Sequence, residues 1–336
     1  MLVAFPFSLS MVSGVGYGCI NASVAQGRSY LNDNINVSDC FFSRTTKLSG
    51  SGGVIYVSGG FLSMSVTNSM FYCCLSDYEG GAIYFDSSNS TIRMICANKC
   101  SASGNHFAFL EASQVNQVEY LSFSFCSHTT NGRYSLKLRS GNQRVDNTNS
   151  SMNNAEEGSG IGIFPPSTFS SSYCTFSNNK ASYGFTLCLS SLSGIISSAN
   201  IVQNSCPPDK GVIRVEDGSH KMLFCIFREN QEVLFYVNYG SLEIQNSFIH
   251  HSGTFSTSTP VSTGINNSVT KTVTYQLTFF NSHYCNTDIP QKSNSLLKTI
   301  IIGVSIISVV LVVSFFIFKC SLKKDLDNPL VGRTIL

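Results

Sequence analysis

The sequence predicts an all-β protein: a right-handed parallel β-helix of about nine coils, followed by one C-terminal transmembrane α-helix. Three observations predict this class. An apolar residue recurs roughly every 25 residues, glycine-led runs of β-favouring residues follow it, and one long uncharged segment lies near the C-terminus. The chain of 336 residues is 43% hydrophobic, with 25 Phe and 14 Tyr. It therefore has ample apolar side chains for a core, which excludes a disordered chain.

Charge argues against a role in nucleic-acid binding. Charged residues make up 12% of the chain, about half of what is usual in soluble domains, and the formal net charge is +2. A protein that binds nucleic acid through phosphate contacts needs a clear excess of basic residues. We therefore expect no nucleic-acid partner.

The repeat is clearest in two segments, CTFSNN at 174–179 and CIFREN at 225–230, which share the pattern C-x-F-x-x-N. The apolar position of this pattern, followed in both directions, gives one interior slot per coil at Phe42, Phe71, Ile95, Phe125, Met152, Phe176, Ile201, Phe227 and Phe248. An Asn stands three residues later at Asn98, Asn179, Asn204 and Asn230. This period indicates that every coil contributes one apolar side chain to a common interior ladder.

Each repeat also contains three short runs of β-favouring residues separated by polar turns. The runs GGVIYV at 52–57 and GGAIYF at 80–85 begin with glycine, and a further run such as FLSMSV at 61–66 follows after a turn. Three strands in so short a repeat leave no room for a crossover helix, which excludes a βαβ unit. The period is also too short for a propeller blade, and the consensus of leucine-rich repeats is absent. We therefore expect a parallel β-helix over residues 35–290.

The segment 299–318 contains no charged residue and is long enough to span a bilayer as a helix. Lys319, Lys323 and Lys324 follow it closely, and the density of basic residues on its N-terminal side is lower. Under the positive-inside rule the C-terminal side is cytoplasmic. The sequence thus predicts a type I plasma-membrane protein with an extracellular β-helix and a cytoplasmic tail at 319–336.

The N-terminal segment, residues 1–18, is a candidate signal peptide, because Leu2–Leu9 is apolar and small residues follow it. No Lys or Arg precedes Arg28, although signal peptides usually begin with a basic residue. A first coil of the β-helix, or a chain whose true start lies further upstream, would explain the segment equally well.

The repeat motifs resemble those of a known group of proteins. GGVI at 52–55 and GGAI at 80–83, with FxxN at 176–179 and 227–230, resemble the paired GGA(I/L/V) and FxxN motifs of chlamydial polymorphic membrane proteins. The layout of residues 35–336 is more similar to the polymorphic-outer-membrane-protein-like surface proteins of trichomonad parasites. That resemblance implies a Ser/Asn-rich right-handed β-helix ectodomain, one C-terminal transmembrane helix and a short tail. The chlamydial proteins carry an autotransporter barrel where this chain has a transmembrane segment, so their route of secretion is not implied.

All thirteen cysteines except Cys320 precede the predicted span, on the side where an oxidising compartment permits disulfides. Several stand close to the interior slots, which favours free thiols stacked in the core: Cys40, Cys174 and Cys225 two residues before the slot, and Cys96 and Cys126 one residue after it. Like positions of adjacent coils are about 4.8 Å apart, within the Cα range of a disulfide. Cys73 or Cys74 is therefore expected to pair with Cys96 or Cys100.

Two kinds of modification or sorting signal are present. Asn-x-Ser/Thr acceptors occur at Asn21, Asn36, Asn89, Asn149 and Asn266. The glycosylation candidates are Asn36, Asn89, Asn149 and Asn266, of which Asn89 and Asn149 lie in predicted turns. In the tail, Asn328 and Pro329 resemble the NPx-type turn signals of endocytosed receptors, with Val331 where the familiar signal has Tyr.

No catalytic constellation stands out in the sequence. Hydrolysis of the polygalacturonase type needs several carboxylates on one face, yet the acids are scattered singly apart from two pairs, 156–157 and 216–217, which we interpret as solvated turns. His250 and His251 have no acidic neighbour, and no group of Cys or His has the close spacing of a zinc site. We therefore expect no catalytic residue, no cofactor and no metal, and the chain is not predicted to be an enzyme.

These observations together predict a single-pass cell-surface protein that serves adhesion or antigenic display through a glycosylated β-helix. Its partners would be the membrane and a glycan or protein ligand outside the cell. A carbohydrate-active β-helix enzyme is one alternative, which the absence of a carboxylate cluster disfavours. An endocytic surface receptor is another, and it differs from an adhesin mainly in the function of the tail.

Overall fold

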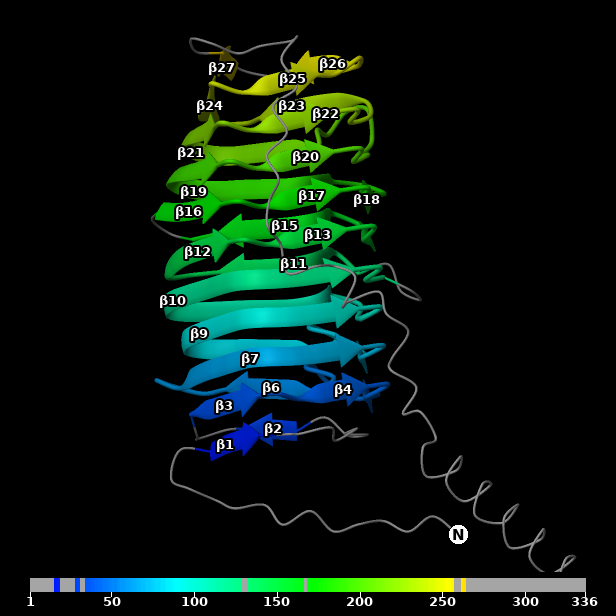
Figure 1. Ribbon diagram of the computed structural model, residues 1–336, viewed down its shortest axis with the longest axis vertical. Coiled ribbons are helices and arrows are strands. Elements are labelled where there is room, and N and C mark those ends of the chain that lie inside the picture. Colours follow the sequence, from blue (N-terminus) through cyan, green and yellow to red (C-terminus); the bar gives the residue numbers. More distant parts are fainter. Residues whose placement is uncertain are drawn as a thin grey trace, which may run out of the picture. The chain divides into compact units, whose positions relative to one another are not determined.

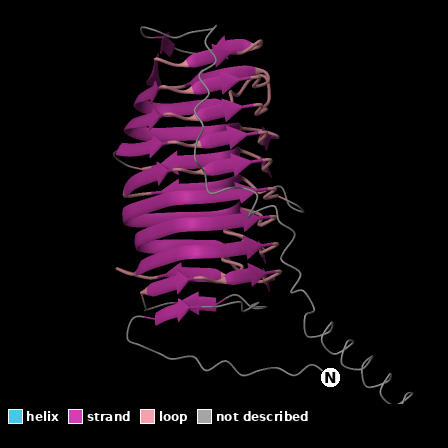
Figure 2. Cartoon of the chain, in the orientation of Figure 1, coloured by secondary structure: helices cyan, strands magenta, loops and turns pink. Residues whose placement is uncertain are grey.

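The computed structural model describes residues 15–18, 28–30, 34–127, 132–165, 168–256 and 261–263. These residues form an all-β parallel β-solenoid of about eight turns, close to the nine expected, and every strand pairing is parallel (Figures 1 and 2). The right-handed sense of the coil stays a prediction. In this part of the chain no helix is long and apolar enough to cross a membrane. The predicted span at 299–318, the tail at 319–336 and residues 1–14 of the candidate signal peptide lie outside the described residues.

The strands stack into three parallel faces, which we name in chain order within one turn. The first face contains β2 (Arg28–Tyr30), β6 (Ile55–Ser58), β11 (Tyr134–Arg139), β15 (Gly158–Phe164), β23 (Val233–Val237) and β26 (Thr254–Ser256). The second face contains β1 (Val15–Gly18), β3 (Ile35–Ser38), β12 (Asn142–Asp146), β16 (Thr168–Ser172), β24 (Gly240–Gln245) and β27 (Val261–Thr263). The third face contains β4 (Phe41–Ser43), β13 (Asn149–Ser151), β17 (Thr175–Ser177), β20 (Asn200–Val202), β22 (Ile226–Arg228) and β25 (Phe248–His250).

Five long strands bend around corners and belong to more than one face. They are β7 (Ser63–Tyr72), β9 (Ile83–Asn98), β10 (Asn105–Ser124), β19 (Phe185–Ser197) and β21 (Ile213–Leu223). Figure 1 shows β9 and β10 as continuous ribbons that turn around the column. Four two-residue strands pair beside the third face: β5 (Thr46–Lys47) with β8 (Leu75–Ser76), and β14 (Asn154–Ala155) with β18 (Lys180–Ala181).

The interior ladder of the third face confirms five of the nine predicted slots. Its members in successive turns are Phe42, Phe71, Ala97, Phe123, Ser150, Phe176, Ile201, Phe227 and Ile249. The predictions of Ile95, Phe125, Met152 and Phe248 were wrong by one or two residues. Phe125 and Met152 instead have positive φ, 52° and 53°, at a sharp corner that turns their side chains outward, where they are 39% and 44% exposed. The sequence alone does not place such a corner, because non-glycine residues rarely adopt positive φ.

The paired glycines of the GGVI and GGAI runs have a steric cause. The first glycine of each pair, Gly52 or Gly80, has φ of +68° or +63°, the left-handed region that favours glycine. The second glycine lies against the backbone of the next turn: a Cβ on Gly53 would stand 2.1 Å from the carbonyl oxygen of Gly81. These runs therefore mark the start of the first face, where the backbones of adjacent turns lie too close together for a side chain.

The corner after the third face holds a column of polar side chains that the sequence revealed only in part. Three residues after the ladder position stand Thr45, Cys74, Cys100, Cys126, Asn153, Asn179, Asn204 and Asn230 in successive turns, all of them buried. The predicted Asn179, Asn204 and Asn230 are confirmed. Asn98 is not a member, since it follows Ala97 directly and its amide donates to Ser124 Oγ at 3.0 Å.

The described cysteines do not form the predicted pairs. Cys73, Cys74 and Cys100 are free thiols, so neither Cys73 nor Cys74 bonds to Cys96 or Cys100, whereas Cys96 is disulfide-bonded. Cys96 precedes the ladder residue Ala97 and therefore points to the other side of its strand. As expected, Cys40, Cys126, Cys174 and Cys225 form no disulfide, and all four are buried. The expectation of a free thiol at Cys96 was wrong.

Candidate ligand-binding face

The outward side of the first face gathers aromatic rings and ammonium groups in one register column. Tyr56, Tyr84, Phe109 and Lys137 occupy the same position in successive turns. The ring centroids of Tyr56 and Tyr84 are 5.0 Å apart and those of Tyr84 and Phe109 are 5.3 Å apart, with the rings stacked. Lys47 Nζ lies 4.5 Å from the Tyr56 ring centroid, and Lys137 Nζ lies 6.0 Å from that of Phe109. The column is thus an aromatic stack with a cation at each end.

A second outward column, two residues further along each strand, carries hydroxyl and charged groups. It contains Ser58, Asp86, Glu111 and Arg139 in successive turns. Arg139 Nε lies 3.6 Å from Glu111 Oε1, and Ser140 Oγ donates to the same oxygen at 3.1 Å. Glu111 is therefore held by a cation and a hydroxyl.

Asp86 lies in the preceding turn. Among the described residues its carboxylate has neither a cation in an ion pair nor a hydroxyl that donates a hydrogen bond to it. Burial raises the pKa of Asp86, the negative charge of Glu111 raises it further, and the more distant Arg139 opposes both effects. Burial also raises the pKa of the adjacent Tyr84, to about 12. Two carboxylates on adjacent turns thus have different environments, one paired and one available.

Beyond Lys137 the face continues as a small aromatic cluster. The rings of Tyr134 and Phe164 meet edge to face at 5.8 Å, and Phe185 lies 6.2 Å from Tyr134. Lys137 Nζ is 4.7 Å from the Tyr134 centroid, and burial lowers the pKa of this lysine. Gly162 follows Lys137 in the column, and a Cβ there would stand 2.6 Å from the Phe164 ring. A side chain at position 162 would therefore displace the Phe164 ring from this cluster.

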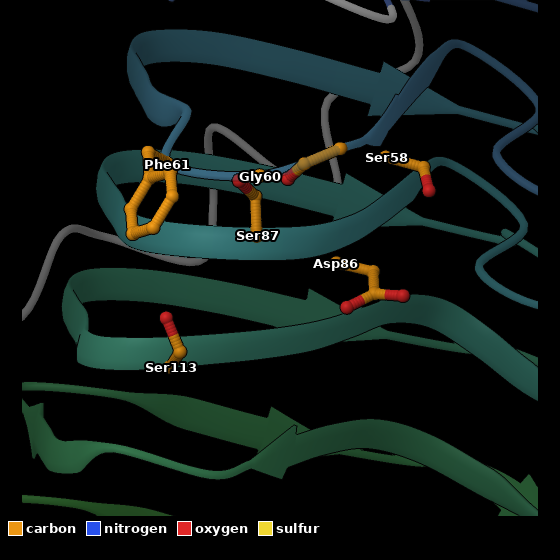
Figure 3. Close-up of a pocket in the computed structure, with 7 residues that line it drawn as sticks. Ser58, Gly60, Phe61, Asp86, Ser87 and Ser113 are labelled. Carbon is orange, nitrogen blue, oxygen red and sulfur yellow. Dashed lines mark hydrogen bonds between the residues drawn. The ribbon is translucent and has the colours of Figure 1, made fainter.

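A cleft of about 430 Å³ opens where the first face meets the turn that leads to the second face. Its lining residues are Ser58, Gly59, Gly60, Phe61, Asp86, Ser87 and Ser113 (Figure 3). Figure 3 shows the Phe61 ring beside Ser113, with Ser58 and Asp86 on the other side of the cleft. Phe61 is 91% exposed, and its φ is +63°.

The turn that carries Phe61 is fixed by Ser87 of the next turn. Ser87 Oγ accepts a hydrogen bond from Leu62 N at 2.8 Å and donates one to Gly59 O at 2.5 Å. The carbonyl oxygen of Leu62 in turn accepts from Ser88 N at 3.1 Å. Bonds on both sides of Phe61 therefore hold its backbone in a positive-φ conformation that a free loop would rarely populate.

The sequence-predicted glycosylation candidates are dispersed. Asn36 lies in β3 and is exposed on the second face. The prediction that Asn89 and Asn149 lie in turns was wrong. Both lie in strands, Asn89 within β9 and Asn149 at the start of β13. The Asn89 amide donates to Ser63 Oγ at 3.5 Å and to Gln114 Oε1 at 3.3 Å, and Asn149 Oδ1 is buried without a hydrogen-bond partner. Asn266 and the tail residues Asn328 and Pro329 lie outside the described residues.

The residue pairs considered for catalysis have structural roles. Glu157 pairs with Arg133 at 2.7 Å and accepts from the Tyr134 hydroxyl at 2.8 Å. The pair at 216–217 lies within β21 and not in a turn, and Glu216 pairs with Arg214 at 2.7 Å. Within the described ranges no group of three or more His, Cys, Asp or Glu side chains could hold a metal ion.

Sequence reasoning missed the column of Asp86, Glu111 and Arg139, because these residues look isolated along the chain. Their spacings, 25 from 86 to 111 and 28 from 111 to 139, match the repeat period. Applying that period to the charged residues, as was done for the apolar ones, would have brought them together. Comparison of the chain with protein-family models, with curated proteins and with solved structures gives no match.

Proposed function

We propose that this protein is a single-pass protein of the plasma membrane whose extracellular solenoid attaches the cell to an outside ligand through the first face. The observation that carries the proposal is the gathering of stacked rings, cations, a paired Glu111 and an available Asp86 in two adjacent register columns that end in an open cleft. The resemblance of the sequence to trichomonad surface proteins, with one span at 299–318, supports the placement at the cell surface.

A solenoid suits this task for a physical reason. Like positions recur about every 4.8 Å along the axis, so a column of side chains can contact successive units of an extended ligand. The charged groups of the first face are close to balance, with Asp86 and Glu111 facing Lys137 and Arg139. Such a face favours a ligand that is recognised by hydrogen bonds and ring contacts more than by net charge.

Adhesion can be tested with the full chain displayed on a cell that does not otherwise adhere. Surface placement is read by antibody labelling without permeabilisation, and attachment by retention on immobilised mucin-type glycoprotein. The double change Glu111→Gln with Arg139→Gln removes one ion pair of the first face and leaves the net charge unchanged. We expect it to reduce attachment several-fold, because these groups lose charge-assisted hydrogen bonds to a ligand.

The matched control removes an ion pair from another face. Lys221 Nζ lies 3.0 Å from Glu243 on the outward side of the second face, in adjacent turns. Lys221→Gln with Glu243→Gln should leave attachment unchanged. Equal attachment of both double variants and the parent, or absence of the chain from the surface, would contradict the proposed function.

A carbohydrate-active enzyme is the second candidate, and one observation favours it. Asp86 and Glu111 are register partners on adjacent turns, and retaining glycosidases use two carboxyl groups about 5–5.5 Å apart. Incubation of the displayed chain with the same glycoprotein distinguishes the two: release of sugar that Glu111→Gln abolishes would identify an enzyme.

A further inference from the structure

We propose that the cleft between Phe61 and Asp86 binds one neutral sugar residue of a glycan outside the cell. The inference rests on the proposed adhesive function and names the ligand class of the same face. It is carried by the juxtaposition of an exposed aromatic ring with available polar groups around a cleft of about 430 Å³, a volume within the usual range of small-ligand sites.

The ring supplies the apolar part of the site. Phe61 is 91% exposed, whereas the phenylalanines of the solenoid interior, such as Phe71 and Phe85, are buried. A single exposed apolar side chain is common on protein surfaces, and Phe61 is singled out because its ring borders the cleft, where it can contact a ligand. The C–H face of a pyranose ring is a flat apolar surface of matching size, and a phenyl ring has no polar atom that would compete with its hydroxyls.

The polar part of the site consists of groups that the fold leaves available. The side chains of Ser58, Asp86 and Ser113 line the cleft and make no hydrogen bond or ion pair with the described residues. A carboxylate can accept from two neighbouring hydroxyls of a sugar at once, and a serine hydroxyl can donate or accept. An alternation of donors and acceptors is the pattern that a polyol presents.

Charge selects among sugars. Asp86 is the ionisable residue of the lining, and Glu111 stands one turn further along the same column. No Lys or Arg lines the cleft, although Arg139 lies beside Glu111. A sialic acid, a uronic acid or a sulfated sugar would therefore bring a second negative charge to Asp86 without a cation to offset it. A neutral hexose avoids this repulsion.

The cleft is also preorganised. Ser87 holds both sides of the Phe61 turn through its bonds to Leu62 N and Gly59 O, so the backbone that carries the ring does not have to be ordered on binding. Gly60 has no heavy atom within 4 Å of its Cβ direction, which leaves the rim open beside the ring. A rigid site loses less conformational entropy when a ligand binds.

The test uses the full chain in lipid nanodiscs and immobilised oligosaccharides. The neutral panel ends in galactose, glucose, mannose or N-acetylglucosamine, and the anionic panel contains the sialylated and sulfated forms. We expect at least one neutral oligosaccharide to bind, with its sialylated form weaker. Phe61→Ala and Asp86→Asn should each weaken that binding by about tenfold, the loss of one ring contact or one charge-assisted hydrogen bond.

The control variant is Tyr239→Ala. Tyr239 is 86% exposed, has φ of 57° and lies between β23 and β24 in the turn that corresponds to that of Phe61. The Tyr239→Ala substitution should leave sugar binding unchanged, and all variants should melt at the temperature of the parent. Binding that Phe61→Ala leaves intact, a preference for sialylated sugars, or salt-sensitive binding of a lysine-rich peptide in place of sugars would overturn the cleft proposal.

The two proposals fail separately. If Phe61→Ala leaves attachment to mucin intact while Glu111→Gln with Arg139→Gln abolishes it, the adhesive face stands and the sugar cleft is wrong. If the nanodisc protein binds a neutral sugar but the chain does not reach the cell surface, the cleft stands and the adhesive function is wrong.

Discussion

The same corner of the solenoid is built in two ways, with thiols in the earlier turns and with asparagines in the later ones. Cys74, Cys100 and Cys126 occupy the position that Asn153 and its successors occupy further along the column. Cys74 Sγ and Cys100 Sγ make long contacts, of 3.7 to 3.8 Å, with one carbonyl oxygen of the preceding turn and one of their own turn. Burial raises the pKa of both thiols well above the usual range, so they stay protonated.

The asparagine turns are joined by short hydrogen bonds instead. Asn204 Oδ1 accepts from Asn179 N at 3.0 Å and from Asn179 Nδ2 at 3.2 Å, and Asn204 Nδ2 donates to Phe176 O at 2.8 Å. Asn204 repeats this arrangement with Asn230, at 3.0 and 3.1 Å. The comparison indicates that the corner needs a small buried side chain, and that hydrogen bonding is one way to stabilise it and apolar packing another.

The interior ladder is common to both regions, so its disruption should have the largest effect in either. Phe123→Asp in the thiol region and Phe176→Asp in the asparagine region should each abolish folding, because both rings are buried and a carboxylate there would have no partner. Phe125→Asp is the matched control, since the Phe125 side chain is 39% exposed. Circular dichroism of the full chain in detergent micelles checks this. Native melting of either ladder variant would show that the slot does not face the core.

Replacement of one ladder asparagine should have the next largest effect. Asn204→Leu removes the acceptor of two bonds from Asn179 and the donor to Phe176 O, which leaves buried polar groups without partners. We expect a loss of about 3–5 kcal/mol in the free energy of unfolding. Gln203→Asn changes the exposed neighbour and should be nearly neutral. A loss below 1 kcal/mol for Asn204→Leu, measured by denaturant titration, would mean that packing alone holds this corner too.

The two regions also differ in how well sequence predicts them. The C-x-F-x-x-N pattern locates three of the four asparagine turns correctly, because Asn179, Asn204 and Asn230 follow their ladder residues at a fixed distance. It misses the turn of Asn153, whose ladder residue is Ser150 and not the predicted Met152. In the thiol turns Phe71 is predicted correctly, but the other two ladder residues are Ala97 and Phe123, and the larger apolar residues Ile95 and Phe125 conceal this register. A cysteine at the corner position does not indicate the register of the repeat, as an asparagine does.

The candidate face shows the same limit. The fold class and the glycine pairs at 52–53 and 80–81 could be predicted, because period and steric demand are local properties of the chain. The meeting of Asp86 with Glu111 does not show among neighbours in sequence, and only the repeat period, applied to the charged residues, would have revealed it. Exposure of Phe61 depends likewise on a corner with positive φ, which sequence rarely signals for phenylalanine.

The thiol region should be the more sensitive to acid, because it contains His106. The ring is buried, its Nδ1 accepts from Ala102 N at 3.3 Å, and burial lowers the pKa of His106 to about 4. The unfolded chain binds this proton near pH 6.5, so the contribution to stability is full above pH 6.5 and is lost as the pH falls toward 4. The expected loss is about 3 kcal/mol.

Melting temperatures of the parent and of His106→Asn between pH 7.5 and 4 check this expectation. Burial also lowers the pKa of His220, which adds an effect of the same sign, while burial raises the pKa of Glu79 and gives one of opposite sign. The part of the pH dependence of the melting temperature that His106→Asn removes is the contribution of His106. Parallel pH profiles of variant and parent would show that His106 does not titrate across folding.

The smallest expected effect compares two positions of the thiol column directly. Cys126 adjoins the asparagine ladder, since its backbone N donates to Asn153 Oδ1 at 2.9 Å. Cys126→Asn extends the ladder by one turn, because the new amide can donate to the same Asn153 Oδ1, and stability should change by less than about 1 kcal/mol. Cys74→Asn places an amide between Thr45 and Cys100 with no ladder partner, and it should cost about 1–3 kcal/mol. Denaturant titration of both variants under reducing conditions gives the difference. If Cys74→Asn is as stable as Cys126→Asn, the corner tolerates an isolated amide and the two regions differ only in composition.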